Sequence, residues 1–166
     1  MTSTIILSPT TTMIDTPAIA TTAEQPTAVI HLTIPRSEIQ KEMGPAHQEL
    51  FAALAAQSIT PTGPWFSHHF RMDPATFDFE VGVPVSSPVK PTGRVAGSRL
   101  PASRVARTVY RGGYEGLGNA WGELESWMKG AGLRAAPELW EIYAAGPESG
   151  SDPSGWRTEL NRPIAE

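Results

Sequence analysis

The sequence predicts an α+β protein in which a strand–helix–strand–strand unit occurs twice and all strands join one antiparallel sheet. Two observations lead to this prediction. Segments with the period-two pattern of strands alternate with two segments whose apolar residues recur every three or four positions, as in helices. The order of these segments is the same in residues 27–85 and 104–164. We therefore expect one domain over residues 27–166, built from two related halves.

The first half opens with a strand and a helix. The β-branched segment TAVIHLTI, residues 27–34, ends at Pro35, whose ring removes a donor from the ladder. A helix is predicted from Ser37 to about Ser58, because apolar residues spaced three and four apart lie along one helical face. These residues are Ile39, Met43, Ala46, Leu50, Ala53 and Leu54.

A hairpin closes the first half, and the second half follows the same order. WFSHHF and TFDFEVGV are separated by Asp73-Pro74, and this pattern is typical of two strands joined by a turn. VARTVY (105–110) is the next predicted strand, and Leu117, Trp121, Leu124 and Met128 then recur at helical spacing. ELWEIYAAG and WRTELNRPI are the last two predicted strands.

The two halves align residue by residue, which indicates an internal duplication with a pseudo-twofold axis. The offset grows only from 73 residues at Pro64 and Pro137 to 79 residues at Glu80 and Glu159. Further matched pairs are Gly44 with Gly118, Leu50 with Leu124, Leu54 with Met128, Phe70 with Tyr143, and Pro84 with Pro163. A duplication of this kind creates a seam between the halves.

Two segments lie outside the repeats. Residues 1–26 are rich in Thr, Pro and Ala and are predicted to be a flexible tail, with the alternative that Ile5 to Leu7 adds an edge strand. Residues 86–103 contain several prolines and are predicted to be a connection across the domain, with GRVAGSRL as a short extra strand.

Composition excludes several classes of function. The formal net charge is −4 and the 13 Lys and Arg are scattered, so no direct nucleic-acid partner is expected. The chain has no cysteine, which removes thiolate catalysis and Cys-based zinc sites. No apolar run reaches membrane-spanning length and no signal peptide is recognisable, so the expected location is cytoplasmic, with no membrane partner.

No metal or cofactor site is predicted. The adjacent His68 and His69 point to opposite faces of a strand, and His31 and His47 lack ligand spacing. The glycines from Gly112 to Gly118 form no GxGxxG loop, and neither a P-loop nor a G-x-S-x-G elbow is present. We expect no cofactor.

A ligand groove is predicted on the face of the sheet that the two helices leave open. Strand alternation places Leu139, Glu141 and Tyr143 on one face of the second hairpin, with Trp140 and Ile142 on the other. The repeat makes His68 the equivalent of Glu141, so Phe66, His68 and Phe70 are expected on the same face as Glu141. A carboxylate among aromatic rings favours an organic cation.

The candidate ligand-binding residues are one carboxylate and the side chains expected around it. They are Glu141, Tyr143, Trp65, Phe66, His68, Phe70, Tyr110, Tyr114, Trp121 and Leu139. Packing in the core is the alternative for each aromatic residue taken singly, and exposure to water on a strand is the alternative for Glu141.

Several motifs together resemble the GyrI-like small-molecule-binding domain, the effector-binding domain of AraC-type and MerR-type multidrug regulators. They are GPWFSHHF, FDFEVGVPV, GGYEGLGNAWGELESW, LWEIYAAGPE and WRTELNRP, within residues 27–164. The resemblance implies a duplicated βαββ fold whose groove binds bulky, often cationic drugs, with a buried Glu after the second helix. Glu141 in WEIY is the matching residue. With no room for a helix-turn-helix, the chain looks like a standalone member.

Three functions follow from the residues and the resemblance. The first is a broad-specificity binding protein that sequesters or senses aromatic or cationic compounds. The second is a hydrolase of the kind that opens the cyclopropane of DNA-alkylating antibiotics, in which Glu141 is the general base. The third is a protein-interaction module. Turnover of a reactive ligand separates the second function from the first.

Overall fold

The computed structural model describes residues 14–145, 152 and 155–165. Its elements, in chain order, are β1 (Ala18–Thr22), β2 (Gln25–Pro35), η2 (Arg36–Glu38), α1 (Ile39–Ala56), β3 (Phe66–Met72), β4 (Thr76–Pro84), β5 (Val95–Leu100), β6 (Ser103–Arg111), η3 (Tyr114–Gly116), α2 (Leu117–Gly130), β7 (Leu139–Ala145) and β8 (Arg157–Pro163). The strands form one antiparallel sheet in the order β1-β6-β8-β7-β3-β4-β2-β5. The predicted α+β class is confirmed. No helix of the described ranges is long and apolar enough to cross a bilayer.

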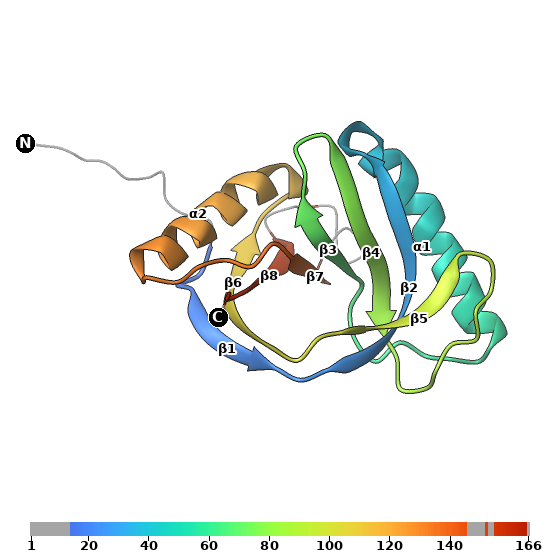
Figure 1. Cartoon of the computed structure of the whole chain (residues 1–166). Coiled ribbons are helices and arrows are strands. Elements are labelled where there is room, and N and C mark those ends of the chain that lie inside the picture. Colours follow the sequence, from blue (N-terminus) through green and yellow to red (C-terminus); the bar gives the residue numbers. More distant parts are fainter. Residues whose placement is uncertain (1–13, 146–151, 153–154, 166) are drawn as a thin grey trace, which may run out of the picture.

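The sheet consists of two halves that meet at a seam between β3 and β7. Outward from this seam the order is β3-β4-β2-β5 on one side and β7-β8-β6-β1 on the other. Each half contributes strand, helix, strand and strand to this arrangement, so the duplicated βαββ fold is confirmed. In Figure 1 the two helices lie on opposite sides of the molecule, with β3 and β7 between them.

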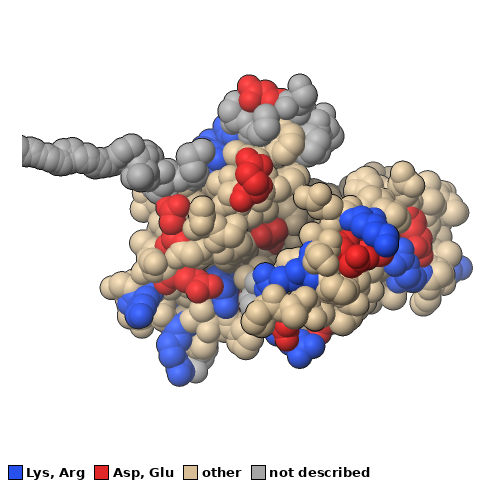
Figure 2. Space-filling view, turned by 90° about the horizontal axis from the view of Figure 1, so that it is seen from above, with Lys and Arg blue, Asp and Glu red and all other residues tan. Residues whose placement is uncertain are grey.

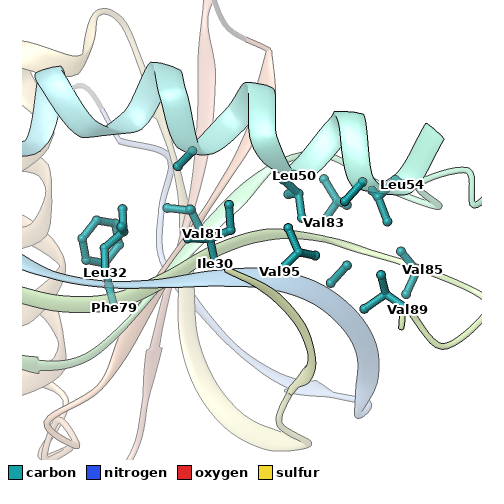
Figure 3. Close-up of a cluster of buried hydrophobic side chains, with 13 residues drawn as sticks. Ile30, Leu32, Leu50, Leu54, Phe79, Val81, Val83, Val85, Val89 and Val95 are labelled. Atoms are coloured by element: carbon teal, nitrogen blue, oxygen red, sulfur yellow. The ribbon is translucent and has the colours of Figure 1, made fainter. Parts of the chain in front are cut away.

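Each helix packs its apolar stripe on its own half of the sheet. α1 contacts β2, β4 and β5, and α2 contacts β6. Leu50 and Leu54 of α1 belong to the same buried cluster as Ile30, Phe79 and Val81. In Figure 3 the two leucines point from the helix toward the sheet, where Val83 lies near both. The repeat-related core below α2 contains Ala106, Tyr110, Ala120, Leu124, Met128, Leu160 and Ile164. Because neither helix lies over the seam, the central strands stay uncovered between α1 and α2.

The other face of the sheet carries a core of its own. Val29, Phe66, Leu100, Val105 and Trp140 form this third cluster. Trp140 and Phe66 are only 2% and 1% exposed. Burial of side chains of this size contributes about 2 kcal/mol each, so the apolar residues on this side serve packing.

The structure differs from the predicted tail over residues 14–26. Ala18–Thr22 form the edge strand β1, which pairs with β6, and Ala20 packs on the third core cluster. Asp15 pairs with Arg111 at 2.9 Å. A short edge strand needs few large apolar residues, so its Thr- and Ala-rich sequence resembles a tail. The predicted segment Ile5 to Leu7 lies outside the described residues.

At the other edge of the sheet, the extra strand predicted within residues 86–103 is present. β5 pairs with β2 from Gln25↔Leu100 to Ile30↔Val95. Thr22 Oγ1, at the end of β1, donates a hydrogen bond of 2.9 Å to the carbonyl oxygen of Pro101. The connection between the halves therefore runs along the sheet and meets β1.

Candidate functional site

A cavity of about 820 Å³ lies between α1 and α2, with the seam strands as part of its wall. This volume is within the range of sites for drug-sized molecules, about 300–1,000 Å³. Figure 2, seen from above, shows a hollow in the molecular surface with acidic and basic side chains scattered around it. The groove was predicted on the opposite face. That prediction is wrong, because the helices leave the seam open on their own side while the third core cluster fills the other.

Glu141 of β7 is the central polar group in the cavity wall. Its carboxylate accepts a hydrogen bond of 2.6 Å from Trp121 Nε1 and one of 2.7 Å from the Tyr143 hydroxyl. Tyr143 in turn contacts Ser67 Oγ at 2.7 Å, so Ser67 is the donor in that contact. α2, β7 and β3 thus each contribute one polar side chain around the same carboxylate. Glu141 is 9% exposed.

Burial sets the ionisation of this cluster. Desolvation raises the pKa of Glu141, while the hydrogen bonds from Trp121, Tyr143 and Ser67 partly oppose this rise. Desolvation and the nearby Glu141 charge hold the pKa of Tyr143 well above its usual value, so Tyr143 stays a neutral donor. A positive charge placed in the cavity would favour ionised Glu141 and gain its full attraction.

The seam register decides which residues of β3 share the cavity with Glu141. Ser67 pairs with Glu141, and His69 pairs with Leu139. Partners in an antiparallel ladder project to the same face, and both pairs line the cavity. The prediction that His68 is the repeat equivalent of Glu141 is therefore wrong by one residue.

This shift places three predicted site residues on the far face of β3. Phe66 belongs to the third core cluster, and its ladder partner is Ile142. The His68 Nε2 atom pairs with Glu138 at 2.6 Å, and its ring contacts Trp140. The Phe70 ring packs against His31 and His68.

Tyr110 is also absent from the residues that line the cavity. It lies in the core below α2, 4% exposed, and its hydroxyl donates to the Gly113 carbonyl oxygen at 2.6 Å. This contact holds the turn that precedes η3. Tyr110 was predicted as a ligand-binding residue, whereas the structure gives it a packing position.

The remaining predicted residues do come together around the cavity. They are Trp65, Tyr114, Trp121, Leu139, Glu141 and Tyr143. Tyr114 is 39% exposed, and its ring contacts both Tyr143 and Trp156. Trp65 contacts the rings of His47 and Phe51. Aromatic rings from both halves of the protein thus surround the carboxylate.

Sequence reasoning missed the glycines that keep the cavity wide. Gly44 of α1 and Gly118 of α2 line it, and a Cβ at either position would meet no atom within 4 Å. Glycine weakens a helix by about 1 kcal/mol relative to alanine. Its recurrence at repeat-equivalent positions was a signal that both helices need space there.

Further lining residues, among them Ser67, His69, Phe77 and Arg36, were missed because each is typical of ordinary core or surface. Ser67, His69 and Phe77 come from the first hairpin, and Arg36 begins η2. His69 stacks on Phe79 with ring centroids 4.7 Å apart. Burial lowers the pKa of His69 to about 4, with His68 and Arg36 adding to the effect. It is therefore neutral at pH 7.

Glu80 and Glu159, which the alignment of the two halves matches, are not among the residues that line the cavity. Glu80 alternates with Phe79 and Val81, which face α1, and it accepts a hydrogen bond from Ser98 at 2.8 Å. Glu159 pairs with Arg107 at 3.4 Å. Among the described residues no three His, Cys, Asp or Glu side chains cluster as metal ligands would.

Comparisons with known proteins show the family and the fold of this chain. The family model for the GyrI-like small molecule binding domain matches residues 15–165. The C-terminal domain of EcmrR has a TM-score of 0.80 at 22% identity, over 91% of this chain and 98% of that one. In the complex of EcmrR with DNA, the chain spans 58% of the EcmrR chain.

Two other solved structures share the fold. A hydrolase encoded by lin2189 from Listeria innocua has a TM-score of 0.65 at 16% identity, over 90% of this chain and 91% of that one. SAV2435, solved bound to tetraphenylphosphonium, has a TM-score of 0.61 at 10% identity, over 91% and 94%. A search of the curated proteins found no match.

Proposed function

The chain belongs to the GyrI-like small-molecule-binding family, and from this premise we propose that it binds bulky aromatic cations between α1 and α2, with Glu141 as the counter-charge. One observation carries this proposal. A carboxylate that is 9% exposed lines a cavity large enough for a drug-sized ligand, with aromatic rings around it. A buried carboxylate is costly unless it is paired, and a ligand cation supplies the missing partner.

The aromatic side chains support a flat or multi-ring ligand. Trp121 and Tyr143 bond Glu141 through their polar atoms, and their rings line the cavity beside it. Tyr114 adds an exposed ring next to Tyr143. Cation–π attraction contributes about 0.5–2 kcal/mol per well-placed ring. It requires no fixed donor pattern, so the site favours broad specificity.

The fold relatives support the same class of ligand. SAV2435 was solved bound to tetraphenylphosphonium, a cation whose charge is enclosed by four aromatic rings. Such an ion neither donates nor accepts a hydrogen bond, so the groups that can attract it are opposite charges and the faces of aromatic rings. The cavity of this chain provides both kinds of group.

Calorimetric titration with tetraphenylphosphonium tests the proposal. We expect micromolar binding, and about tenfold weaker binding by Glu141→Gln, which keeps the shape and removes the charge. Glu24→Gln is the matched control, because it removes a carboxylate that pairs with Arg99 on the surface. Neutral triphenylphosphine oxide should bind weakly and equally to all three proteins. Equal phosphonium affinity in wild type and Glu141→Gln would contradict the proposal.

A second candidate is hydrolysis of a strained electrophilic ring. The raised pKa of Glu141 favours it, because a general base works best with a pKa near the working pH. Glu141 would take a proton from water as the water oxygen attacks a ring carbon. The electron pair of the broken ring bond passes to the electron-withdrawing group that activates the ring, and that group then takes up the proton, so the product is the ligand plus one water. Incubation with a cyclopropane-bearing alkylating agent tests this: mass spectrometry should show one added water, lost in Glu141→Gln. Recovery of intact ligand would exclude this activity toward that agent.

A further inference from the structure

The charges that line the cavity are arranged with opposite signs on its two sides. The charged lining residues are Arg36, Glu115 and Glu141. Arg36 begins η2, which leads into α1, and Glu115 lies in η3, which leads into α2. These two short helices are repeat-related, so they stand on opposite sides of the pseudo-twofold axis. The duplication has thus diverged into a basic side and an acidic side.

Arg36 is held in place by contacts that leave its charge without a carboxylate partner. Its Nε donates to the Asp73 carbonyl oxygen at 2.7 Å, and its guanidinium carbon lies 4.5 Å from the centre of the Phe77 ring. The Asp73 carboxylate accepts from the backbone N–H groups of Ala75 and Thr76 instead. In the part of the chain that the structure describes, Arg36 forms no ion pair.

The neighbouring side chains compensate this positive charge only in part. The Asp73 carboxylate attracts Arg36, and its pKa is lowered chiefly by the backbone N–H of Ala75 and, among other causes, by the Arg36 charge, but no ion pair forms between these two described side chains. His69, which also lines the cavity, is 7% exposed, and its Nδ1 atom has no hydrogen-bond partner among the described residues. A neutral imidazole there offers hydrogen-bonding capacity without charge. A simple organic cation would gain nothing from Arg36 and would be repelled by it.

The sheet geometry separates the two charged regions. Glu141, Ser67 and Val81 are successive ladder partners across β7, β3 and β4. Phe77, below the Arg36 guanidinium, lies farther along β4 on the same face. Strand spacing and rise give about 10 Å across the sheet and about 13 Å along it. One charged atom cannot contact both Arg36 and Glu141, so a ligand that uses both carries separate charges.

We propose that the preferred ligand is an aromatic zwitterion, whose cationic ring system lies against Glu141 and whose carboxylate or similar anionic group binds Arg36. This inference rests on the proposed cation site and specifies its ligand class. The fork of the guanidinium suits a carboxylate, since it can donate two parallel hydrogen bonds. Phe77 and Asp73 fix the fork in advance, which lowers the entropy lost on binding.

A matched pair of dyes tests this inference. Rhodamine 110 carries a free carboxylate, and rhodamine 123 is its methyl ester, a simple cation with the same rings. Fluorescence polarisation should show wild type binding rhodamine 110 about fivefold more tightly. Arg36→Gln should remove this preference and, because the repulsive charge is gone, should bind the ester more tightly than wild type does, whereas Arg36→Lys should keep part of the preference. Arg99→Gln, a surface control that also removes one positive charge, should retain the full preference.

The outcomes separate this inference from the proposal on which it depends. If both dyes bind in a Glu141-dependent way but wild type shows no preference for the free carboxylate, the zwitterion inference is wrong and the cation site stands. A preference that survives Arg36→Gln also overturns it. If neither dye binds, or binding ignores Glu141→Gln, both the inference and the cation site fail. Thermal unfolding of each variant confirms that the proteins compared are folded.

Discussion

Ser67 and Glu141 lie directly opposite each other across the seam where the two halves of the sheet meet. They occupy equivalent positions in the two repeats, yet one is a small hydroxyl and the other a carboxylate. Both belong to the hydrogen-bonded group centred on Tyr143. The pseudo-twofold axis therefore passes between a hydroxyl on one strand and a carboxylate on the other, so the two halves of the cavity wall differ at its centre.

Glu141→Gln should be more stable than wild type at neutral pH. The pKa of Glu141 is raised in the folded state, so the folded protein holds this proton more tightly than the unfolded chain does. Wild-type stability therefore falls as pH rises above the ordinary value near 4.5 toward the raised pKa. Glu141→Gln has no carboxyl group at this position and so does not lose stability in this way. We expect its free energy of unfolding at neutral pH to be about 1 kcal/mol higher than that of wild type, which raises Tm by about 3 °C.

Thermal unfolding between pH 4 and pH 8 measures this difference. The gap between variant and wild type should be smallest near pH 4 and widen as pH rises. A variant less stable than wild type at pH 8 would show that the carboxylate stabilises the fold.

Binding of tetraphenylphosphonium should strengthen with rising pH, because only ionised Glu141 attracts a cation. Trp121→Phe keeps a ring and removes the Nε1–H that donates to Glu141. Losing a hydrogen bond to a charged group, worth about 1.5 kcal/mol, raises the pKa of Glu141 further. The midpoint of the pH dependence should then move up by about one unit. Trp127→Phe, on the same helix and outside the cavity lining, is the control. If Trp127→Phe shifts the midpoint as much as Trp121→Phe does, the hydrogen bond from Trp121 does not set the pKa of Glu141.

Gly118→Met should close part of the cavity without harming the fold. The position has open space on the cavity side, and methionine favours a helix over glycine by up to about 1 kcal/mol. We expect binding of a bulky cation to weaken about tenfold while Tm is unchanged or higher. Gly122→Met is the matched control, since Gly122 also has open space in α2 but does not line the cavity. If both variants bind like wild type, the ligand lies elsewhere.

Ala20→Asp should destabilise the protein by about 2 kcal/mol or more, because β1 packs Ala20 on the third core cluster. Thr21→Asp, the exposed neighbour on the same strand, should change stability by less than about 0.5 kcal/mol. Urea unfolding of the two variants gives the comparison. Equal, small effects would mean that β1 contributes little to the fold.

The sequence predicted the helices and most strands because their periodic patterns reflect burial in single elements. Leu50 and Leu124 illustrate this, since each lies at helical spacing and each is fully buried. β1 escaped prediction, because its partner β6 is far along the chain and its own residues are small. Contacts of this kind depend on the assembled sheet.

The site was predicted in part, and the misplacement of Phe66, His68 and Phe70 has one cause. Aligning Phe70 with Tyr143 gives an offset of 73, whereas the ladder pairs Ser67 with Glu141 and requires 74. Both strands have register shifts beside these aromatic residues, between His69 and Arg71 and between Ile142 and Ala145. Because side chains alternate between the two faces of a strand, an alignment error of one residue assigns every side chain of that strand to the wrong face. The prediction of Glu141 as a site residue did not depend on the alignment, because alternation within its own strand already placed it on the same face as Leu139 and Tyr143.

A crystal structure of the protein with tetraphenylphosphonium would show whether a cation occupies the cavity between the helices against Glu141. We expect the phosphonium between α1 and α2, with Glu141 as the nearest carboxylate and the rings of Trp121 and Tyr143 in contact with its phenyl groups. Density for the cation on the far face of the sheet, or in the cavity but away from Glu141, would contradict the proposed cation site.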